Sequence, residues 1–349
     1  MVILLGLFSS FAFSGFFLRS LKKIAIKIDF VDRPNGALKK HGQATPYLGG
    51  VGIFLGAWIS IIGVSYLSNC LSQDLLALFF LNLILLVLGT WDDRRHISWR
   101  IRLFIQLLVS AATIYFLDLY HSAGVTSFIF YTIFLAGIIN SINLIDISDG
   151  LSSTISISSI TILILADLFL LGDLNIALLV VEVGFLGSLS YFLFINFPPA
   201  KMYMGDGGSN CLGHILGVLC FASFTNLDWV TGTLSTALVL AIPLFDTFFV
   251  MALRLSKRKN PFLGSPDHFA VRMRLNGYSA LSILFSTLFF TAVIGLLVII
   301  TLIKSSAVFS AILSAIIFSS FLLVAFILFK AFPIESDRTL FFRDFDYES

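Results

Sequence analysis

Charged side chains are scarce in this sequence. Of its 349 residues, only 12% are Asp, Glu, Lys or Arg, whereas 58% are hydrophobic and 38 are Phe. A water-soluble chain of this length could not bury so much apolar surface in one core. The composition therefore excludes an ordinary soluble protein. It predicts an integral membrane protein that forms a single domain over residues 1–349.

Several motifs of common enzyme classes are also absent. The three cysteines have neither the spacing of a metal site nor a shared outer loop that would indicate a disulfide, so we interpret them as buried small hydrophobic residues. The sequence contains no Walker phosphate loop, no pair of zinc-binding histidines and no Gly-x-Ser-x-Gly turn. We expect membrane lipid as a partner and no nucleic acid.

Long apolar runs predict an all-α polytopic membrane protein. A hydrocarbon core about 30 Å thick requires roughly 20 apolar residues in a helix that crosses it. Eleven runs have a suitable length. The predicted spans are 3–19, 49–67, 75–91, 101–118, 125–142, 154–171, 175–195, 210–225, 230–253, 280–303 and 306–329.

The distribution of basic residues predicts the orientation of these spans. Lys and Arg residues near span ends remain cytoplasmic. With eleven spans, every Lys and Arg except Lys304 falls on one side, and several aspartates lie in the opposite connections. We therefore predict that the N-terminus is outside and that the C-terminus is cytosolic.

Two adjacent carboxylates, Asp92 and Asp93, directly follow an apolar run. Ionisable groups at span ends are costly unless they are wetted, paired or bound to a metal. Adjacent like charges repel, which raises one pKa or recruits a cation. A solvated helix end is the alternative interpretation. The basic run that follows, which includes Arg102, is suited to binding phosphate.

Asn143, Asp146 and Asp149 form a second polar segment. If the segment is helical, these residues are three apart and form one ridge on the helix surface. Such a ridge can bind Mg²⁺ or hydrogen-bond a ribose and a base. The alternative is that the residues cap the helix that follows.

Two further loops carry chemistry-bearing residues. Asp206 stands in a glycine-rich segment that enters a helix, where backbone N–H groups can approach an anion. Such loops are commonly just turns. His268 lies near Arg272 and Arg274, although a lone histidine is more often an ordinary loop residue. Together, the four segments predict Mg²⁺-assisted phosphoryl transfer to or from a lipid at the cytosolic membrane surface.

In these segments the chain resembles the polyprenyl-phosphate N-acetylhexosamine-1-phosphate transferases, a bacterial family that starts lipid-linked glycan synthesis. The resemblance covers roughly residues 32–279. It rests on five motifs: Asp32-Arg-Pro-Asn with Lys39-Lys-His41 and Thr45-Pro-Tyr-Leu-Gly49-Gly50; Asp92-Asp93; Asn143-Leu-Ile-Asp146 with Asp149-Gly150; Asn196 with Met204-Gly-Asp206 and Gly208-Ser209; His268 with Arg272. The family implies eleven spans in the bacterial inner membrane and a cytosolic active site. Its members often form homodimers.

The resemblance implies a role for each matching residue. Catalytic roles are expected for Asp92, Asp93 and His268, with one of the two adjacent acids deprotonating the lipid phosphate. Asp206, with Asn143 beside it, is expected to bind Mg²⁺, which Mn²⁺ could replace. Substrate contacts are expected from Arg102 at phosphate, Asp146 near the ribose, Asp149, Asn196 and Tyr203 around the uracil, and also from Arg272, Lys39 and His41.

The chain departs from the family pattern at four positions. Ile147 stands where glycine is usual, Ala270 and Val271 replace two histidines, and Arg102 replaces a lysine. Because only glycine freely adopts a positive φ, the change at Ile147 predicts a different turn. The histidine changes affect the expected contacts to the sugar and the pyrophosphate.

The function that the resemblance implies is transfer of an N-acetylhexosamine 1-phosphate from a UDP-sugar, expected to be UDP-GlcNAc, to undecaprenyl phosphate with release of UMP. This would be the first membrane step of a cell-envelope glycan such as O-antigen lipopolysaccharide, capsule or a teichoic linkage. One alternative is a multispan transporter, which the placement of the acids at span ends disfavours. Another is an inactive family member that serves as a scaffold.

Overall fold

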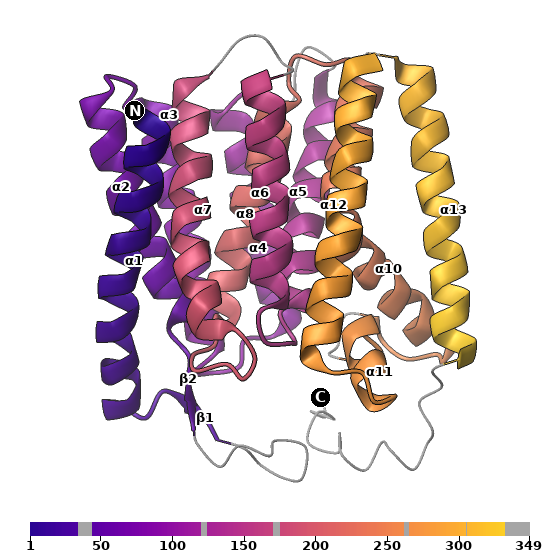
Figure 1. The fold of residues 1–349 in the computed structure, drawn as a ribbon, viewed down its shortest axis with the longest axis horizontal. Helices are drawn as coiled ribbons and strands as arrows, with labels where there is room; N and C mark the ends of the chain where they lie inside the picture. The colour runs from indigo at the N-terminus through magenta and orange to yellow at the C-terminus, as the bar shows by residue number, and fades with distance from the viewer. Residues whose placement is uncertain (34–43, 120–123, 170–174, 262–264, 305, 332–349) are drawn as a thin grey trace.

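A computed structural model shows that the protein is a bundle of helices (Figure 1). The structure describes residues 1–33, 44–119, 124–169, 175–261, 265–304 and 306–331, and the predicted substrate residues Lys39 and His41 lie outside them. The elements are α1 (Val2–Lys27), β1 (Val31–Asp32), β2 (Thr45–Pro46), α2 (Gly49–Leu67), α3 (Gln73–Asp92), α4 (Trp99–Phe116), α5 (Gly124–Ile145), α6 (Leu151–Phe169), α7 (Ile176–Asn196), α8 (Gly205–Ser223), α9 (Trp229–Val239), α10 (Ala241–Ser256), α11 (Phe269–Leu275), α12 (Ala280–Lys304) and α13 (Ala307–Ala331).

The prediction of an all-α polytopic membrane protein is confirmed. Among the described residues, nine helices are long and apolar enough to cross a membrane, and a bent pair of helices raises the count to ten at most. The nine are α1 to α7, α12 and α13, and each coincides with a predicted span. The count of eleven and the orientation stay predictions, because two predicted spans take other forms.

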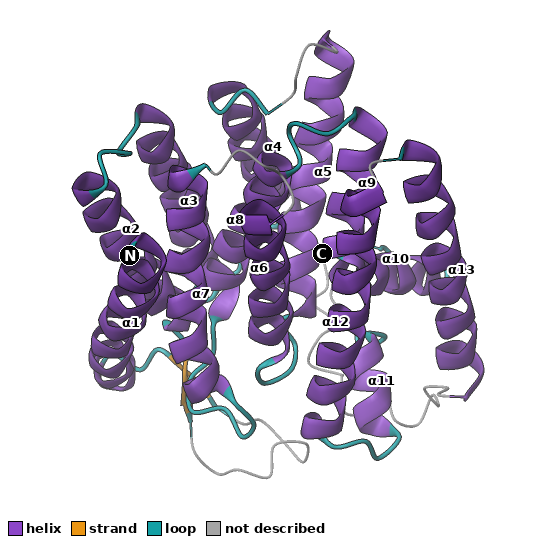
Figure 2. Ribbon diagram, turned by 45° about the horizontal axis from the view of Figure 1, so that its top comes forward, coloured by secondary structure: helices purple, strands orange, loops and turns teal. Residues whose placement is uncertain are grey.

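The first of these, the span predicted at 210–225, is the central helix α8. It begins earlier, at Gly205, and carries Asp206, Asn210 and His214, which make it less apolar than its neighbours. Nearly all of its side chains are buried, and it contacts α2, α3, α5 and α6. Both views place it inside the bundle (Figure 1, Figure 2). Because these helices shield α8 from lipid, it can be polar.

The span predicted at 230–253 is not continuous. It is broken into α9 and α10, which meet at an angle of 79°. Pro243 gives the physical reason, since a proline has no N–H and its ring clashes with the carbonyl four residues earlier, which belongs to Val239. Val239 is the last residue of α9. The predicted span at 230–253 is therefore bent in its middle, and α10 runs obliquely to α12 and α13 (Figure 1).

Helices α3 and α8 approach closely at the end of the bundle where α3 ends and α8 begins, here called the site end. A Cβ atom added to Gly89 of α3 would overlap the backbone of Asp206 and Gly207, and one added to Gly207 would overlap Thr90. Only a residue without a side chain permits this contact. The glycines therefore bring the acids at the end of α3 against the start of α8.

The segment before α2 is fastened to the turn before α8. The backbone N–H of Gly49 donates to the carbonyl of Tyr203 at 3.0 Å, and that of Gly50 donates to Met204 at 2.8 Å. The N–H of Tyr203 donates in turn to the carbonyl of Pro46 in β2 at 2.9 Å. Two sequence-distant motifs, Thr45–Gly50 and Tyr203–Gly205, thus form one layer at the site end.

Candidate functional site

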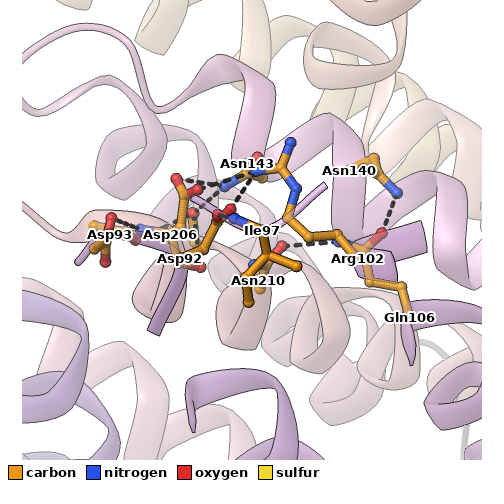
Figure 3. A network of polar contacts seen from close by, with 11 residues as sticks. Asp92, Asp93, Ile97, Arg102, Gln106, Asn140, Asn143, Asp206 and Asn210 are labelled. Atoms are coloured by element: carbon orange, nitrogen blue, oxygen red, sulfur yellow. Dashed lines mark hydrogen bonds and ion pairs between the residues drawn. The ribbon is translucent and has the colours of Figure 1, made fainter. Parts of the chain in front are cut away.

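Asp92 links the end of α3 to the start of α4. Its side chain is buried, with 4% of the residue exposed. One carboxylate oxygen, Oδ1, accepts from the backbone N–H of Ile97 at 2.6 Å, and the other accepts from Nη1 of Arg102 at 2.6 Å (Figure 3). The carboxylate therefore orders the α3–α4 connection and fixes the guanidinium.

Asp206, in the first turn of α8, lies beside the same guanidinium. Its Oδ2 is 3.2 Å from Nη1 of Arg102, and its Oδ1 accepts from Nδ2 of Asn143 at 3.0 Å (Figure 3). Asn143, near the end of α5, also donates to Oγ of Ser209 at 2.9 Å. We call Asp92, Asp93, Arg102, Asn143 and Asp206 the acid site. Four helices supply it, so the structure brings these five predicted residues together.

Asp93 contacts the start of α8 directly. Its Oδ1 accepts from the backbone N–H of Asp206 at 3.0 Å, and Gly205 adopts a φ of +76° against its carboxylate. Burial and then the negative charge of Asp206 raise the pKa of Asp93 to about 8, although hydrogen bonds from the backbone of Asp206 and Gly207 oppose the shift. A pKa near neutrality is a property of general bases and of acids that lack a cation.

Asn143, Asp146 and Asp149 do not form the predicted ridge on one helix, so that prediction is wrong. Helix α5 ends at Ile145, and a turn with Gly150 at a φ of +73° follows, so Asp146 and Asp149 leave the helical surface. The positive φ falls at Gly150, and Ile147 has none. The turn therefore forms without a glycine at position 147, and its difference from the family turn stays a prediction.

Asp146 faces the acid site from this turn. Its Oδ1 accepts from Oγ of Ser152 at 2.5 Å. Burial raises the pKa of Asp146 to about 7; the bond from Ser152 opposes the shift, and the charges of Asp206 and Asp149 add to it. A cation at the acid site would therefore favour ionisation of Asp146 as well.

The residues predicted to surround the uracil form a neighbouring group. Oδ2 of Asp149 accepts from the backbone N–H of Ala200 at 2.9 Å. Burial and the charge of Asp149 raise the pKa of Tyr203, whose ring centroid lies 5.8 Å from that of Tyr47. Asp149 and Tyr203 are thus brought together, beside an aromatic ring that the sequence did not single out.

Asn196, also predicted at the uracil, is buried and holds two turns together. Its Oδ1 accepts from the N–H of Gly150, and its Nδ2 donates to the carbonyl of Met202, each at 2.8 Å. Its contact with a base stays a prediction. The two hydrogen bonds of Asn196 connect the α5–α6 turn to the α7–α8 turn.

His268 and Arg272 belong to a separate group near α11. Nδ1 of His268 lies 2.6 Å from Oδ2 of Asp246, and both residues are almost fully buried. Nη2 of Arg272 donates to Oδ1 of Asp267 at 2.5 Å, and its guanidinium lies 5.5 Å from the ring centroid of Phe249. The catalytic role of His268 and the phosphate contact of Arg272 stay predictions, and each residue has an acidic partner here.

Asp267 completes this group, which we call the histidine cluster: Asp246, Lys257, Asp267, His268 and Arg272. Nζ of Lys257 lies 2.9 Å from Oδ1 of Asp267. Burial alone would raise the pKa of Asp267, but hydrogen bonds from Lys257 and Ser265 and the charge of Arg272 hold it below its usual value. Asp267 was not among the predicted site residues, although its place directly before His268 is a visible signal in the sequence.

The acid site has the donors that a hard divalent cation requires. Among the described residues, no group of three or more His, Cys, Asp or Glu side chains is arranged around one metal position. Mg²⁺, however, commonly binds through one or two carboxylates and completes its shell with water and substrate phosphates. Asp92 and Asp206 share the one guanidinium of Arg102, and Asp93 lies against Asp206, so the acid site has more carboxylates than cations. Asp206 with Asn143 therefore fits such a partial site.

Comparison with known proteins identifies a family. Residues 75–224 match the family described as glycosyl transferase family 4. A Bacillus subtilis protein named probable undecaprenyl-phosphate N-acetylglucosaminyl 1-phosphate transferase is 30% identical over 271 residues, which cover 74% of this chain and 73% of that protein. The undecaprenyl-phosphate alpha-N-acetylglucosaminyl 1-phosphate transferases of Thermotoga maritima and Yersinia pestis are 30% and 31% identical, and the alignments cover 79% and 74% of this chain and 84% and 72% of those proteins.

Proposed function

The chain belongs to glycosyl transferase family 4, and from this we propose that it transfers an N-acetylhexosamine 1-phosphate from a UDP-sugar to undecaprenyl phosphate. UDP-GlcNAc is the first candidate donor, because the relatives are named for N-acetylglucosamine. The observation that carries the proposal is the acid site, in which four helices converge on Asp206. Undecaprenyl-diphosphate-sugar and UMP are the products.

In this reaction an oxygen of the lipid phosphate attacks the β-phosphorus of the UDP-sugar. A new P–O bond forms while the bond from the β-phosphorus to the bridging oxygen breaks, and that oxygen leaves with UMP. Arg102 is already oriented by Asp92 and is 30% exposed, so its free N–H groups can donate to the diphosphate. Asp93 lies beside Asp206 and is placed to accept a proton from the lipid phosphate.

Asp206, with Asn143 beside it, would hold Mg²⁺ or Mn²⁺, which would neutralise the diphosphate as negative charge develops on the leaving UMP. Asn143 keeps the Asp206 carboxylate oriented through its 3.0 Å hydrogen bond. Asp149 and Tyr203 lie at the same end and supply a hydrogen-bond acceptor and a ring face for the uridine.

The setting of this site is a multi-pass membrane protein, for which we propose the bacterial inner membrane with the site end in the cytosol. The basic residues favour this orientation, since those of α10 and of the α3–α4 connection lie at the site end. The proposed role is the first membrane step of a cell-envelope glycan, such as O-antigen lipopolysaccharide, capsule or a teichoic linkage. A homodimer is part of the proposal on the family pattern.

The test uses purified protein, undecaprenyl phosphate and a panel of radiolabelled UDP-sugars. We expect the label of one sugar to enter an organic-extractable lipid while UMP is released, and EDTA to abolish the reaction. Asp206→Asn preserves the shape of the side chain but removes its charge, and should lower turnover about 1,000-fold. Asp29→Asn is the matched control, because Asp29 is exposed and pairs only with its helix-end neighbour Arg33 in the described structure.

Two outcomes would overturn the proposal. Full activity of Asp206→Asn would remove Asp206 from the mechanism. The absence of any lipid product from a folded wild-type protein would return the transporter and scaffold alternatives, which uptake into proteoliposomes would then separate.

A further inference from the structure

Three amide side chains, those of Gln106 and Asn210 buried and that of Asn140 partly buried, lie one helical turn deeper in the bundle than the acid site. Nε2 of Gln106 donates to Oδ1 of Asn210 at 3.1 Å, and Nδ2 of Asn140 donates to Oε1 of Gln106 at 2.7 Å (Figure 3). Gln106 is 2% exposed and Asn210 is 1% exposed. We call these residues the amide layer.

Each member of the amide layer shares a helix with a member of the acid site. On α4, Gln106 is four residues after Arg102; on α8, Asn210 is four residues after Asp206; on α5, Asn140 is three residues before Asn143. Residues three or four apart lie above one another on one face of a helix. The same three helices are thus joined twice, by the Arg102–Asp206–Asn143 bonds and, one turn deeper, by the amides.

We propose that the amide layer is a positioning device for the transferase site, with Gln106 as its centre. Gln106 uses its donor toward α8 and its acceptor toward α5, so it fixes the rotation and the depth of α4 relative to both neighbours. The rotation of α4 decides whether Nη1 of Arg102 can lie close to both carboxylates at once, 2.6 Å from Oδ2 of Asp92 and 3.2 Å from Oδ2 of Asp206. The inference rests on the proposed function, and adds three residues to it.

The amide layer tolerates less movement between the helices than apolar helix packing does. Apolar contacts allow small rotations, whereas a hydrogen bond weakens steeply when its angle or length changes. A displaced α4 would leave the buried amides of Gln106 and Asn210 with unsatisfied donors and acceptors, which is costly. The layer therefore favours one discrete arrangement of α4, α5 and α8.

A second buried polar contact on the same helices provides the control. Oγ1 of Thr113 on α4 lies 2.8 Å from Nε2 of His214 on α8, two turns deeper than Gln106. It joins the same pair of helices, and neither residue contacts the acid site in the described structure. Removing it tests the loss of a buried α4–α8 hydrogen bond without a change next to Arg102.

The test compares Gln106→Leu, Gln106→Glu and Thr113→Val in purified full-length protein. Leu keeps the approximate volume but breaks both bonds; Glu can still accept from Asn140 and from a flipped Asn210 amide. We expect Gln106→Leu to lower kcat at least about 10-fold with KM for both substrates within about twofold. Gln106→Glu should restore kcat to within about threefold of wild type, and Thr113→Val should stay within about twofold of wild type.

A readout that does not depend on turnover separates this inference from the proposed function. The rise in melting temperature on titration with Mg²⁺ alone reports binding at the acid site, and Gln106→Leu should shift its midpoint to at least about fivefold higher Mg²⁺. If wild-type protein responds to Mg²⁺ but makes no lipid product, the proposed function fails while the positioning role is still measured. Asn140→Leu replaces Gln106→Leu if that variant does not fold.

Three results would overturn the positioning role. One is an unchanged kcat and Mg²⁺ midpoint in a Gln106→Leu protein with a lowered melting temperature. Another is a loss of kcat in Thr113→Val as large as that in Gln106→Leu, which would indicate general loosening of the α4–α8 contact. The third is failure of Gln106→Glu to restore either quantity.

Discussion

The acid site and the histidine cluster are both charged groups at the site end, yet their charges are balanced differently. In the acid site, Asp92 and Asp206 share the guanidinium of Arg102, Asp93 lies against the backbone of Asp206, and the pKa of Asp93 rises to about 8. In the histidine cluster, Asp246 faces His268, and Asp267 faces both Lys257 and Arg272. The first group retains an excess of negative charge that a cation can neutralise. The second satisfies its own charges.

This difference in charge balance predicts different effects of substitution in the two groups. Buried charges that are fully paired hold a fold in one arrangement, and breaking such a pair is strongly destabilising. Acids crowded without enough cations bind metals or shift their pKa values, which is typical of active sites. We therefore expect substitutions in the acid site to act on turnover, and substitutions in the histidine cluster to act on stability.

Among the changes that compare the two groups directly, the largest effect should come from the guanidinium of the acid site. Arg102→Met removes the charge that bonds Asp92 and Asp206, and should lower turnover by about 100-fold, the usual cost of one lost transition-state donor. Lys257→Met is the matched control, since Lys257 also pairs with a buried acid but in the other cluster. Turnover of the control within about twofold of wild type, measured by lipid product formed, would sharpen the distinction. A comparable loss in both variants would contradict it.

Stability should show the reverse order. Asp267→Asn leaves the buried guanidinium of Arg272 without its carboxylate and should destabilise the protein by about 3 kcal/mol. Thermal unfolding in detergent measures this loss. Asp29→Asn, which breaks an exposed pair with Arg33, should cost less than about 1 kcal/mol. Equal melting temperatures for the two variants would show that the histidine cluster does not hold the fold.

A change in helix spacing should affect the acid site without touching its charges. Gly207→Ala adds a methyl group that overlaps Thr90 and the carbonyl of Leu86, so α3 and α8 must separate. We expect a cost of about 1–3 kcal/mol from overpacking and a fall in turnover, because Asp93 moves away from Asp206. Gly63→Ala is the control, since a Cβ atom there meets nothing within 4 Å. It should be neutral or stabilising by about 0.5–1 kcal/mol, and unaltered turnover in Gly207→Ala would disprove the spacing argument.

The smallest effect concerns acid pH and the histidine cluster. Because the pKa of Asp267 is lowered on folding, its contribution is complete above the unfolded value of about 3.9 and is lost as pH falls through the folded pKa. The difference in melting temperature between wild type and Asp267→Asn should therefore stay nearly constant from pH 6 to about pH 4.5 and narrow as pH falls below about 4. A difference that widens on acidification would have the wrong sign for this pair.

The sequence singled out the residues that meet in the acid site because their signals are local. Asp92 and Asp93 end an apolar run, and Asp206 follows the glycine that starts α8, so each motif marks a helix end without knowledge of the fold. The error at Asp146 and Asp149 has a local cause as well: the three-residue spacing suits a helix, but Gly150 with its positive φ makes a turn. Spacing alone does not show where a helix ends.

The remaining differences arise from tertiary contacts. No local sequence pattern shows that His268 pairs with Asp246 of α10, or that Arg272 of α11 pairs with Asp267. The sequence also does not distinguish an exposed loop histidine from a buried, paired one. Gln106 and Asn210 are isolated amide residues within predicted spans, and neither was among the predicted site residues. The break between α9 and α10 did have a visible signal in Pro243, but the hydropathy of the whole run concealed it.

The polarity of α8 has a consequence for how the protein is made. A segment that carries Asp206, Asn210 and His214 gains little by entering a bilayer alone, since each polar side chain opposes insertion. Its partners are Asn82 on α3, Gln106 and Thr113 on α4, and Asn143 on α5, all of which are synthesised earlier. We therefore expect α8 to integrate only after these helices have assembled, so that membrane insertion and construction of the active site are one event during biogenesis.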